Sequence, residues 1–313
     1  MLSRINLNEV TNAGCKTRCN QQSRFDITEN GICKEVKSIV DNLPIRCVGY
    51  WSVEKVYLLY QYFGIFSNGM KNKWEINYIE ICCGTGRCIS RESGTEFDGT
   101  SLCITKHPAF SYIHKALFFD FDQIVVNTLK SRLGKLNLLN AQVLIGDYNN
   151  PIEISNKIIR EINPNSLSLV FIDPTDCSLP FELIRLIKKS LPKIDLIINV
   201  ATGTDYNRNI KEALLDQIKF KDVINKYNNF LGSDLFFLNN ENIELARAGN
   251  NLELRTNFRN SYKNSLENIG YEYFNMKRIH NLYDILFASS DKKGLEFWDK
   301  VNKYKFDGQK SIF

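Results

Sequence analysis

The stretch YIEICCGTGR (78–87) decides the predicted fold. Its first half belongs to a short apolar run, INYIEIC (76–82), which is typical of a strand buried on both faces. Its second half is a Gly-x-Gly turn at Gly84 and Gly86, where small residues let backbone amides come close to a bound ligand. A lone Gly-x-Gly also occurs in ordinary strand–loop turns, so the rest of the chain must decide between the two interpretations.

Similar apolar runs follow this stretch and are separated by amphipathic segments. The runs are KALFFDF (115–121), AQVLIG (141–146), SLVFID (168–173) and DLIINV (195–200). The segments between them, such as 124–133, 156–162 and 181–191, have the spacing of helices. Strand alternating with helix predicts a parallel, doubly wound sheet.

The chain closes with two further runs, YEYFNMKRI (271–279) and LYDILFASS (283–290), joined by a tight His-Asn connection. They predict an antiparallel hairpin, followed by a helix over 294–304. The expected fold class is therefore α/β, a Rossmann-like Class I methyltransferase fold. Its sheet is expected to be mostly parallel and seven-stranded, with a terminal antiparallel hairpin.

The remaining segments set the domain organisation. Residues 1–45 predict a polar, irregular N-terminal arm, and 46–313 one methyltransferase-like domain with a helical insertion at about 206–268. Apolar spacing predicts a helix over 51–66, capped by Ser52 and ended by Gly64. Residues 88–114 are expected to form a loop beside the cofactor cleft.

An ordered set of acidic residues favours the interpretation of the Gly-x-Gly turn as a ligand-binding turn. Asp120 closes the second run, Asp147 the third and Asp173, followed by Pro174, the fourth; Asp122 is a lesser candidate beside Asp120. Ligands of open α/β sheets lie beyond the carboxyl ends of the strands, so these acids are expected to converge on one crevice. Strand-terminal acids that only form turns are the alternative.

A glycine turn followed by acids at the ends of successive strands is typical of enzymes that bind S-adenosylmethionine (SAM). Glu80 is then expected to reach the amino group of SAM, and Cys82, Gly84 and Gly86 to form the turn around its amino-acid end. In the same interpretation Asp120 takes the ribose hydroxyls, with Asp122 as the lesser candidate for that role. Asp147 is expected to hydrogen-bond the adenine amine.

A nicotinamide dinucleotide is the competing cofactor. Its fingerprint needs Gly-x-Gly-x-x-Gly and an acid about 20 residues further on. Ile89 stands at the third Gly position and Asp120 comes too late. The pattern favours SAM.

Several motifs together resemble the three-Cys-motif partner family, TcmP. They are LPIRCVGYWSVEKVYLLYQYF (43–63), YIEICCGTGR (78–87), DGTSL (98–102), FFDFD, GDYN, FIDP, DLIIN and LYDILFASSDKKGLEFWDKV (282–301). The resemblance covers about residues 43–205 and 268–303. It implies a bacterial, SAM-dependent methyltransferase-like protein that works beside an iron–sulfur, radical-SAM-like partner. The three cysteines of the family name belong to that partner and are not Cys15, Cys19 and Cys33.

Two positions depart from the family pattern. Thr100 and Ser101 stand where the family has Ser-Pro, and Thr175-Asp176 follows Asp173-Pro174 where an aromatic residue and Gly are usual. The second departure leaves the substrate-facing geometry open.

Asp173 and Pro174 are the candidate catalytic pair, because they close the fourth strand beside the expected methyl position. Asp173 either holds or deprotonates the acceptor, or only caps a turn. Arg208 is a candidate for binding an anionic substrate group, with a surface salt bridge as the alternative. Cys177 lacks a neighbouring His and is interpreted as a buried thiol.

Composition and charge exclude other classes. A chain with 43% hydrophobic and 24% charged residues is neither collagen-like, coiled-coil nor disordered. Lys and Arg number 40 against 35 Asp and Glu, and the basic residues do not cluster, so nucleic acid is a possible but weakly supported partner. The chain has no run of 18 apolar residues, and its first residues are polar. These two features predict a cytoplasmic protein without membrane contact.

Nine cysteines are too few for a disulfide scaffold, so reduced thiols are expected. Cys15, Cys19, Cys33 and Cys47 lack Cys-x-x-Cys spacing, so no metal is assigned; a four-thiolate zinc site stays open as the weaker alternative.

The leading hypothesis is a SAM-dependent methyltransferase of the three-Cys-motif partner type, with nucleic acid as one candidate acceptor. The alternatives are a non-catalytic or regulatory SAM-fold partner and a nucleic-acid-binding module.

Overall fold

The computed structural model describes residues 5–15 and 24–303. The chain divides into two compact units. The first comprises residues 1–147, 166–171 and 297–313, and the second residues 148–165 and 172–296.

The larger sheet has seven strands in the order β12-β13-β11-β10-β5-β8-β9. Their bounds are β5 Ile76–Ile81, β8 Ile113–Asp120, β9 Ala141–Ile145, β10 Leu167–Ile172, β11 Ile194–Val200, β12 Tyr273–Ile279 and β13 Tyr283–Ser289. β5, β8 and β9 pair in parallel, whereas β13 pairs antiparallel with both β11 and β12. The α/β class is confirmed, and the sheet is mixed.

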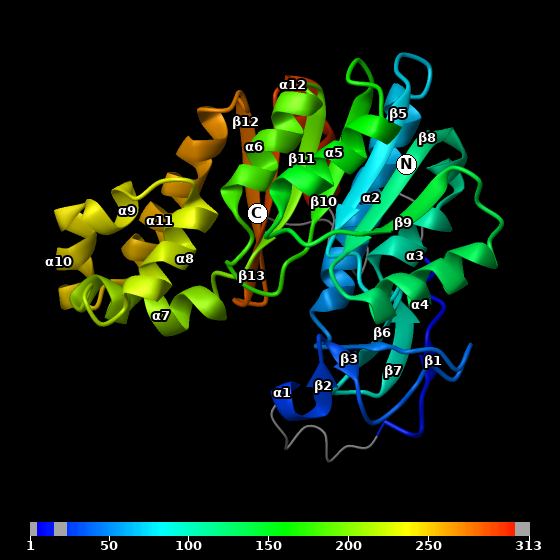
Figure 1. Cartoon of the computed structure of the whole chain (residues 1–313), viewed down its shortest axis with the longest axis horizontal. Coiled ribbons are helices and arrows are strands. Elements are labelled where there is room, and N and C mark those ends of the chain that lie inside the picture. The colour runs from blue at the N-terminus through cyan, green and yellow to red at the C-terminus, as the bar shows by residue number, and fades with distance from the viewer. Residues whose placement is uncertain (1–4, 16–23, 304–313) are drawn as a thin grey trace. The chain divides into compact units, whose positions relative to one another are not determined.

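A second sheet, which the sequence did not predict, has six short strands in the order β1-β7-β6-β4-β3-β2 (Figure 1). They are β1 Val10–Thr11, β2 Thr28–Glu29, β3 Ile32–Cys33, β4 Arg46–Val48, β6 Arg87–Ser90 and β7 Thr95–Asp98. Only two to four residues long, they are too short to show a period of two.

The expected loop over 88–114 is wrong. This segment contains most of β6, all of β7, helix α3 (Thr100–Thr105) and the 3₁₀ helix η2 (Pro108–Tyr112). The segment connects the smaller sheet, which contains β6 and β7, to β8 of the larger sheet. The described residues of the N-terminal 45 contribute β1, β2, β3 and the short helix α1 (Arg24–Ile27).

Helix α2 (Ser52–Met70) is longer than predicted, and Ser52 does not cap it. The cap position is Trp51, with no side-chain hydrogen bond, and the helix continues through Gly64. A Cβ at Gly64 would lie 2.7 Å from His107 Nε2, so this glycine serves close packing instead of helix termination.

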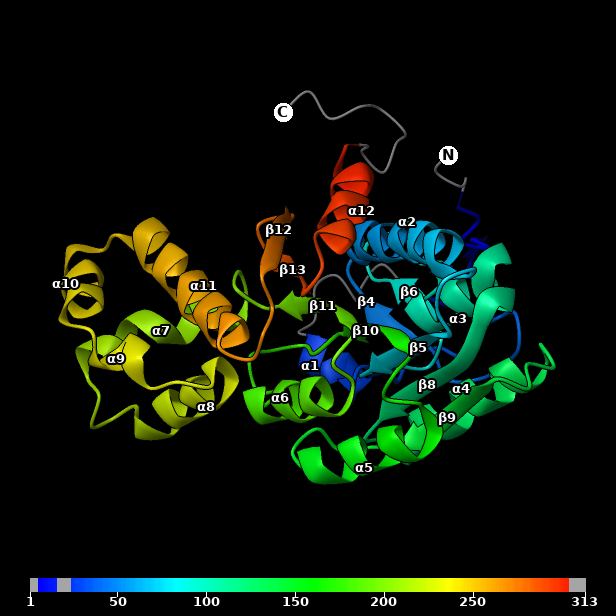
Figure 2. The same cartoon turned by 90° about the horizontal axis from the view of Figure 1, so that it is seen from above.

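Helices complete both units. They are α4 Gln123–Gly134, α5 Pro151–Glu161, α6 Phe181–Ser190, α7 Asp205–Leu215, α8 Lys221–Leu231, α9 Leu235–Leu238, α10 Asn240–Ala248, α11 Asn251–Glu267 and α12 Lys292–Asn302. In the second unit α5 and α6 run side by side (Figure 2), and α7 to α11 gather into one group (Figures 1 and 2). None of the helices described between residues 24 and 303 is long and apolar enough to cross a membrane.

Aromatic side chains form the core of that helical group. Phe258 packs against Tyr206, Tyr227, Phe230 and Phe236, with ring centroids 4.9 to 6.1 Å apart. These rings are buried, so the aromatic residues of this segment pack the core of the helical group.

Candidate functional site

The turn after β5 has the backbone of a close-approach loop. Cys82, Gly84 and Gly86 have φ values of +64°, +65° and +87°, in the left-handed region that favours glycine. The amide of Gly84 donates to Asp120 Oδ2 at 3.1 Å, and the amide of Cys83 donates to the carbonyl of Phe119 at 3.0 Å. The turn is therefore docked on the carboxyl end of β8.

Glu80 is fully buried beneath this turn. Its carboxylate accepts hydrogen bonds from the hydroxyls of Tyr78 (2.8 Å), Thr100 (2.5 Å) and Ser101 (3.1 Å). Thr100 and Ser101, the two departures from the family pattern, thus supply donors that fix the start of α3 to β5. The expected role of Glu80 toward the amino group of a cofactor stays a prediction.

Asp120 ends β8 and is 5% exposed. Besides Gly84, the amide of Asp122 donates to Asp120 Oδ1 at 3.3 Å. Burial raises the pKa of Asp120, and the Arg46 guanidinium and the two amides oppose that rise. Glu80, Gly84 and Asp120 are therefore brought together in one unit, as the sequence predicted.

The other two predicted acids of this unit lie differently. Asp122 is the N-cap of α4 and accepts from the amides of Ile124 and Val125; Asn30 also donates to it, at 2.7 Å. Asp147 follows β9 on an exposed loop, where the amide of its neighbour Gly146 donates to the carbonyl of Asp120 at 2.9 Å.

Arg46 is a site residue that the sequence reasoning missed. It starts β4, and its Cδ and Nη1 atoms lie 3.4 Å from where a Cβ of Gly84 would be. Burial raises the pKa of both Asp120 and Cys83, and the positive charge of Arg46 opposes that rise. The available signal was a single cation inside the apolar stretch LPIRCVG (43–49).

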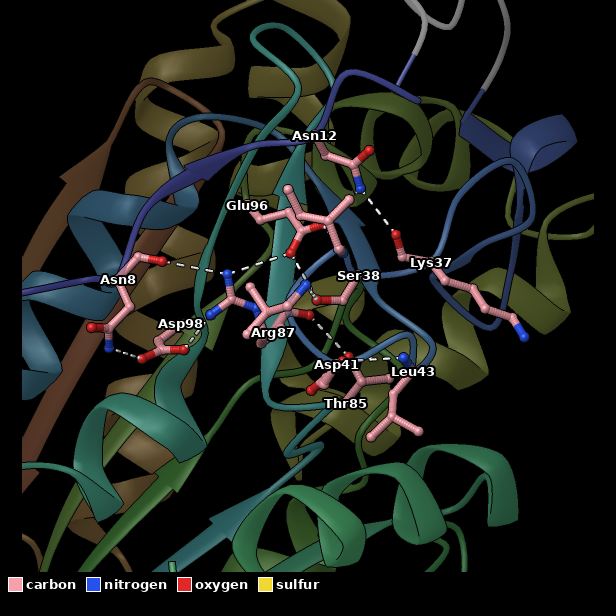
Figure 3. Close-up of polar contacts among 12 residues, drawn as sticks. Asn8, Asn12, Lys37, Ser38, Asp41, Leu43, Thr85, Arg87, Glu96 and Asp98 are labelled. Carbon is pink, nitrogen blue, oxygen red and sulfur yellow. Dashed lines mark hydrogen bonds and ion pairs between the residues drawn. The ribbon is translucent and has the colours of Figure 1, made fainter. Parts of the chain in front are cut away.

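A polar network holds Thr85 and Arg87, the residues at the end of the turn (Figure 3). Arg132 Nη1 donates to the carbonyl of Thr85 at 2.6 Å, and Arg132 also pairs with Asp41 at 2.8 Å. Arg87 pairs with Asp98 at 2.8 Å and with Glu96 at 3.4 Å. These bonds fix the turn before any ligand arrives.

The N-terminal residues complete this network. Asn8 Nδ2 donates to Asp98 at 2.5 Å, Asn12 Nδ2 to Glu96 at 2.6 Å, and Ser38 Oγ to Glu96 at 2.8 Å (Figure 3). The predicted arm is therefore hydrogen-bonded to β7.

The second unit holds the predicted catalytic pair. Asn199, on β11, donates from Nδ2 to Asp173 Oδ1 at 2.9 Å and to the carbonyl of Pro174 at 3.3 Å. The Oδ1 atom of Asn199 is buried without a hydrogen-bond partner. Asp173 is half-buried, so its carboxylate is oriented by Asn199 and still reaches solvent.

The helical segment contacts the residues that follow this pair. Lys226 of α8 lies 2.6 Å from Asp205 and 3.9 Å from Asp176. Asp205 also accepts from the amide of Cys177 at 3.0 Å. The thiol of Cys177 is fully buried, and burial raises its pKa, so it stays neutral and is no nucleophile.

Two predictions fall on residues that the structure does not describe fully. Arg208 lies in α7, but its side chain is outside the described residues. Cys19 is outside them as well. Among residues 5–15 and 24–303, no three His, Cys, Asp or Glu side chains are grouped as metal ligands.

The fold and the turn define an α/β protein with a candidate ligand site at the carboxyl ends of parallel strands. No protein-family model and no curated protein sequence matches the chain. The resemblance to the three-Cys-motif partner family therefore stays a prediction.

Solved structures that are similar include three of broad coverage. Protein LPL1258 from Legionella pneumophila has a TM-score of 0.46 at 10% identity, covering 84% of this chain and 95% of its own. Magnesium protoporphyrin IX methyltransferase from Synechocystis, with bound S-adenosylhomocysteine, scores 0.37 at 10% identity over 76% of this chain and 84% of its own. The methyltransferase domain of a bacterial CtHen1 scores 0.38 at 12% identity over 74% and 98%. No activity is transferred from similarities this low.

Proposed function

We propose that this chain is a SAM-dependent methyltransferase of the Rossmann-like Class I type. The observation that carries the proposal is the turn of residues 82–87, with three left-handed positions and the Gly84 amide bonded to the Asp120 carboxylate. This hydrogen bond joins the two parts of the SAM pattern, the glycine turn after β5 and the acid that ends the neighbouring strand β8.

The residues present fit SAM. Gly84 has no side chain between its backbone and Arg46, so the amino-acid end would lie at Gly84 with its carboxylate toward the Arg46 guanidinium. Asp120 would accept hydrogen bonds from the ribose hydroxyls, and Asp147 would accept one from the adenine amine. Glu80 would act through Thr100 and Ser101, by holding α3 against the turn.

SAM supplies a methyl group that is already activated by its sulfonium. The protein must then place an acceptor atom and, where needed, remove its proton. Asp173 is assigned this role, since Asn199 fixes its carboxylate and Pro174 stiffens the backbone after it. The acceptor is screened among DNA, RNA and protein, with nucleic acid as the first pool.

Calorimetry with S-adenosylhomocysteine tests the binding part. Asp120→Asn keeps the side-chain shape but removes the charge, and we expect affinity to fall at least about tenfold, the loss of one charged hydrogen bond. Asp122→Asn is the matched control, because Asn caps a helix as well as Asp does and the residue is only two positions away. Equal affinity of both variants and the wild type would contradict the proposed site.

Labelled SAM tests the chemical part. In the pool that accepts label, Asp173→Asn is expected to keep SAM affinity and lose turnover, since its interaction matters chiefly in the transition state. Asp176→Asn, three residues away, is the control and is expected to keep most activity. Unchanged turnover in Asp173→Asn removes this residue from the mechanism.

A non-catalytic SAM-fold partner of an iron–sulfur, radical-SAM-like protein is the second candidate. A cysteine, Cys82, at the first left-handed position of the turn and the three protein hydroxyls that donate to the Glu80 carboxylate favour it. S-adenosylhomocysteine binding without label transfer to any pool, together with co-purification of such a partner, would decide for this alternative.

A further inference from the structure

A pocket of about 370 Å³ lies between α11 and the β12–β13 hairpin, within the second unit. We call it the α11–hairpin pocket. This volume is within the range of small-molecule sites, about 300–1,000 Å³. Its described lining contains three cationic side chains and one carboxylate; the residues are Arg259, Asn260, Lys263, Phe274, Asn275, Met276, Arg278, Asp284 and Leu286.

The sequence builds this pocket from two simple periods. Side chains alternate along β12, so Phe274, Met276 and Arg278 share one face of the strand. Residues four apart share one face of a helix, which aligns Arg259 and Lys263 on α11. A basic helical stripe therefore faces a strand that carries a ring at one end and a guanidinium at the other.

The charges that line the pocket are not balanced, although Lys263 is also paired, at 3.3 Å, with Glu267, which does not line it. Asp284 is fully buried and binds Arg259 through two nitrogens, at 2.6 and 2.9 Å, while Arg278 Nη1 lies 3.6 Å away. The Thr202 hydroxyl also donates to Asp284. One carboxylate thus serves two guanidinium groups, and both remain about a quarter exposed.

Neighbouring cations also act on Arg278. Arg255, one turn before Arg259, and Arg259 itself both lower the pKa of Arg278, after the larger effect of burial. Arg278 is held in place by Asn281, which accepts from its Nε at 2.9 Å and from its Nη2 at 2.8 Å. Like charges held this close favour an anion between them.

A flat apolar surface borders the cations. Lys263 Nζ lies 5.3 Å from the centre of the Phe274 ring, and Met276 follows on the same face. A ring beside a cluster of cations suits a ligand with an aromatic part and a phosphate part.

We infer that the α11–hairpin pocket binds a nucleotide, with its phosphate on Arg278 and Lys263 and its base against Phe274. The phosphate belongs either to a free nucleotide or to the 5′ end of a nucleic-acid strand. This inference goes beyond the proposed function and does not depend on SAM binding at the turn of residues 82–87.

Calorimetry on the full chain, in excess S-adenosylhomocysteine, tests it with four probes: AMP, adenosine, inorganic phosphate and a 5′-phosphorylated single-stranded pentanucleotide. We expect AMP or the pentanucleotide to bind more tightly than adenosine or phosphate. Tighter binding of AMP identifies the free nucleotide, and tighter binding of the pentanucleotide identifies the strand end. Binding of neither, or equal binding of phosphate and AMP, overturns the inference.

Three variants locate the binding. Lys263→Gln is expected to weaken it about tenfold, because a charged contact to phosphate is lost. Phe274→Leu keeps an apolar side chain on β12 and is expected to weaken the nucleotide but not inorganic phosphate. Lys293→Gln is the control, since Lys293 is similarly exposed and similarly paired, with Glu296 at 2.8 Å, but does not line the pocket.

Equal effects of Lys263→Gln and Lys293→Gln would overturn the inference. The variant Asp120→Asn separates a failure of this inference from a failure of the proposed function. AMP affinity is expected to be unchanged in that variant whether or not SAM binds at the turn. Loss of AMP binding in Asp120→Asn would place the nucleotide at the turn and overturn the inference.

Discussion

Cys82 has a φ of +64° in a position where a glycine would be unstrained. A side chain in this left-handed conformation costs about 1–2 kcal/mol. The side chain is only partly buried, so it gains little packing in return. The turn is therefore formed in spite of this residue, and its neighbours supply the missing stability.

Cys82→Gly is expected to stabilise the protein by about 1 kcal/mol, which raises the melting temperature by roughly 2–4 °C. Thermal unfolding followed by circular dichroism measures this. Cys88→Gly, in strand β6, is the control and should have the opposite sign, because glycine weakens a strand. A lower melting temperature for Cys82→Gly would show that the thiol makes a contact worth more than the strain.

At the scale of single residues, the sequence predicted three residues of the candidate cofactor site and missed a fourth. Glu80, Gly84 and Asp120 were found because strand ends and glycine turns can be recognised locally. Arg46 was not found, since it reaches Gly84 only through the pairing of β4 with β6, some forty residues later in the chain. Contacts made by long-range pairing leave no local pattern.

Helix α2 illustrates how an element depends on one missing Cβ. Ala is normally better than Gly inside a helix by about 1 kcal/mol. At Gly64, however, the new Cβ would lie 2.7 Å from His107 Nε2, and the His107 ring is packed against Tyr60 and Phe63. The imidazole has no room to move away.

Gly64→Ala is therefore expected to destabilise the protein by about 1–3 kcal/mol, the usual cost of overpacking. Gly134→Ala, at the end of α4, is the control: nothing lies within 4 Å of its added Cβ, so it should be neutral or stabilising. Urea denaturation measures both. A stabilising Gly64→Ala would mean that α2 and η2 separate at little cost.

The same packing makes the stability depend on pH. Burial lowers the pKa of His107 to about 4, from an ordinary value of 6.5. The folded state thus favours the neutral ring, so this contribution to stability is complete above pH 6.5 and is lost as the pH falls from 6.5 toward 4.

His107→Asn is expected to be less stable at pH 7 but to lose less stability than the wild type between pH 7 and pH 5. Asn keeps an acceptor for the amide of Ala109, which His107 Nδ1 now binds at 2.9 Å. Denaturation midpoints at both pH values are the measurement. An equal loss of stability in His107→Asn and in the wild type between the two pH values would show that His107 is not the group that titrates.

At the scale of the whole molecule, the large sheet was predictable and the small one was not. The seven long strands were recognised because their apolar runs continue over several residues. The small sheet instead buries Glu96 and Asp98 completely, together with Arg87. Charged residues in a core contradict the apolar pattern by which cores are recognised, so this sheet became visible only in the structure.

Arg87→Met is expected to destabilise the protein by about 3–5 kcal/mol, because it leaves two buried carboxylates without their shared cation. Arg185→Met removes an exposed, solvent-screened pair with Glu182 and is expected to cost far less than Arg87→Met. Denaturation in urea compares the two. Similar losses would show that Asn8, Asn12 and Lys106, whose Nζ lies 2.6 Å from Asp98 Oδ2, satisfy the carboxylates without the arginine.

The order of the small sheet also constrains when the protein can take shape during synthesis. Val10 pairs with Glu96, so β1 must wait for a partner that is made more than eighty residues later. At about 5–20 residues per second, that delay is on the order of ten seconds. During this interval Asn8 and Asn12 lack the carboxylates that bind them, so β1 is without both its strand partner and its side-chain hydrogen bonds.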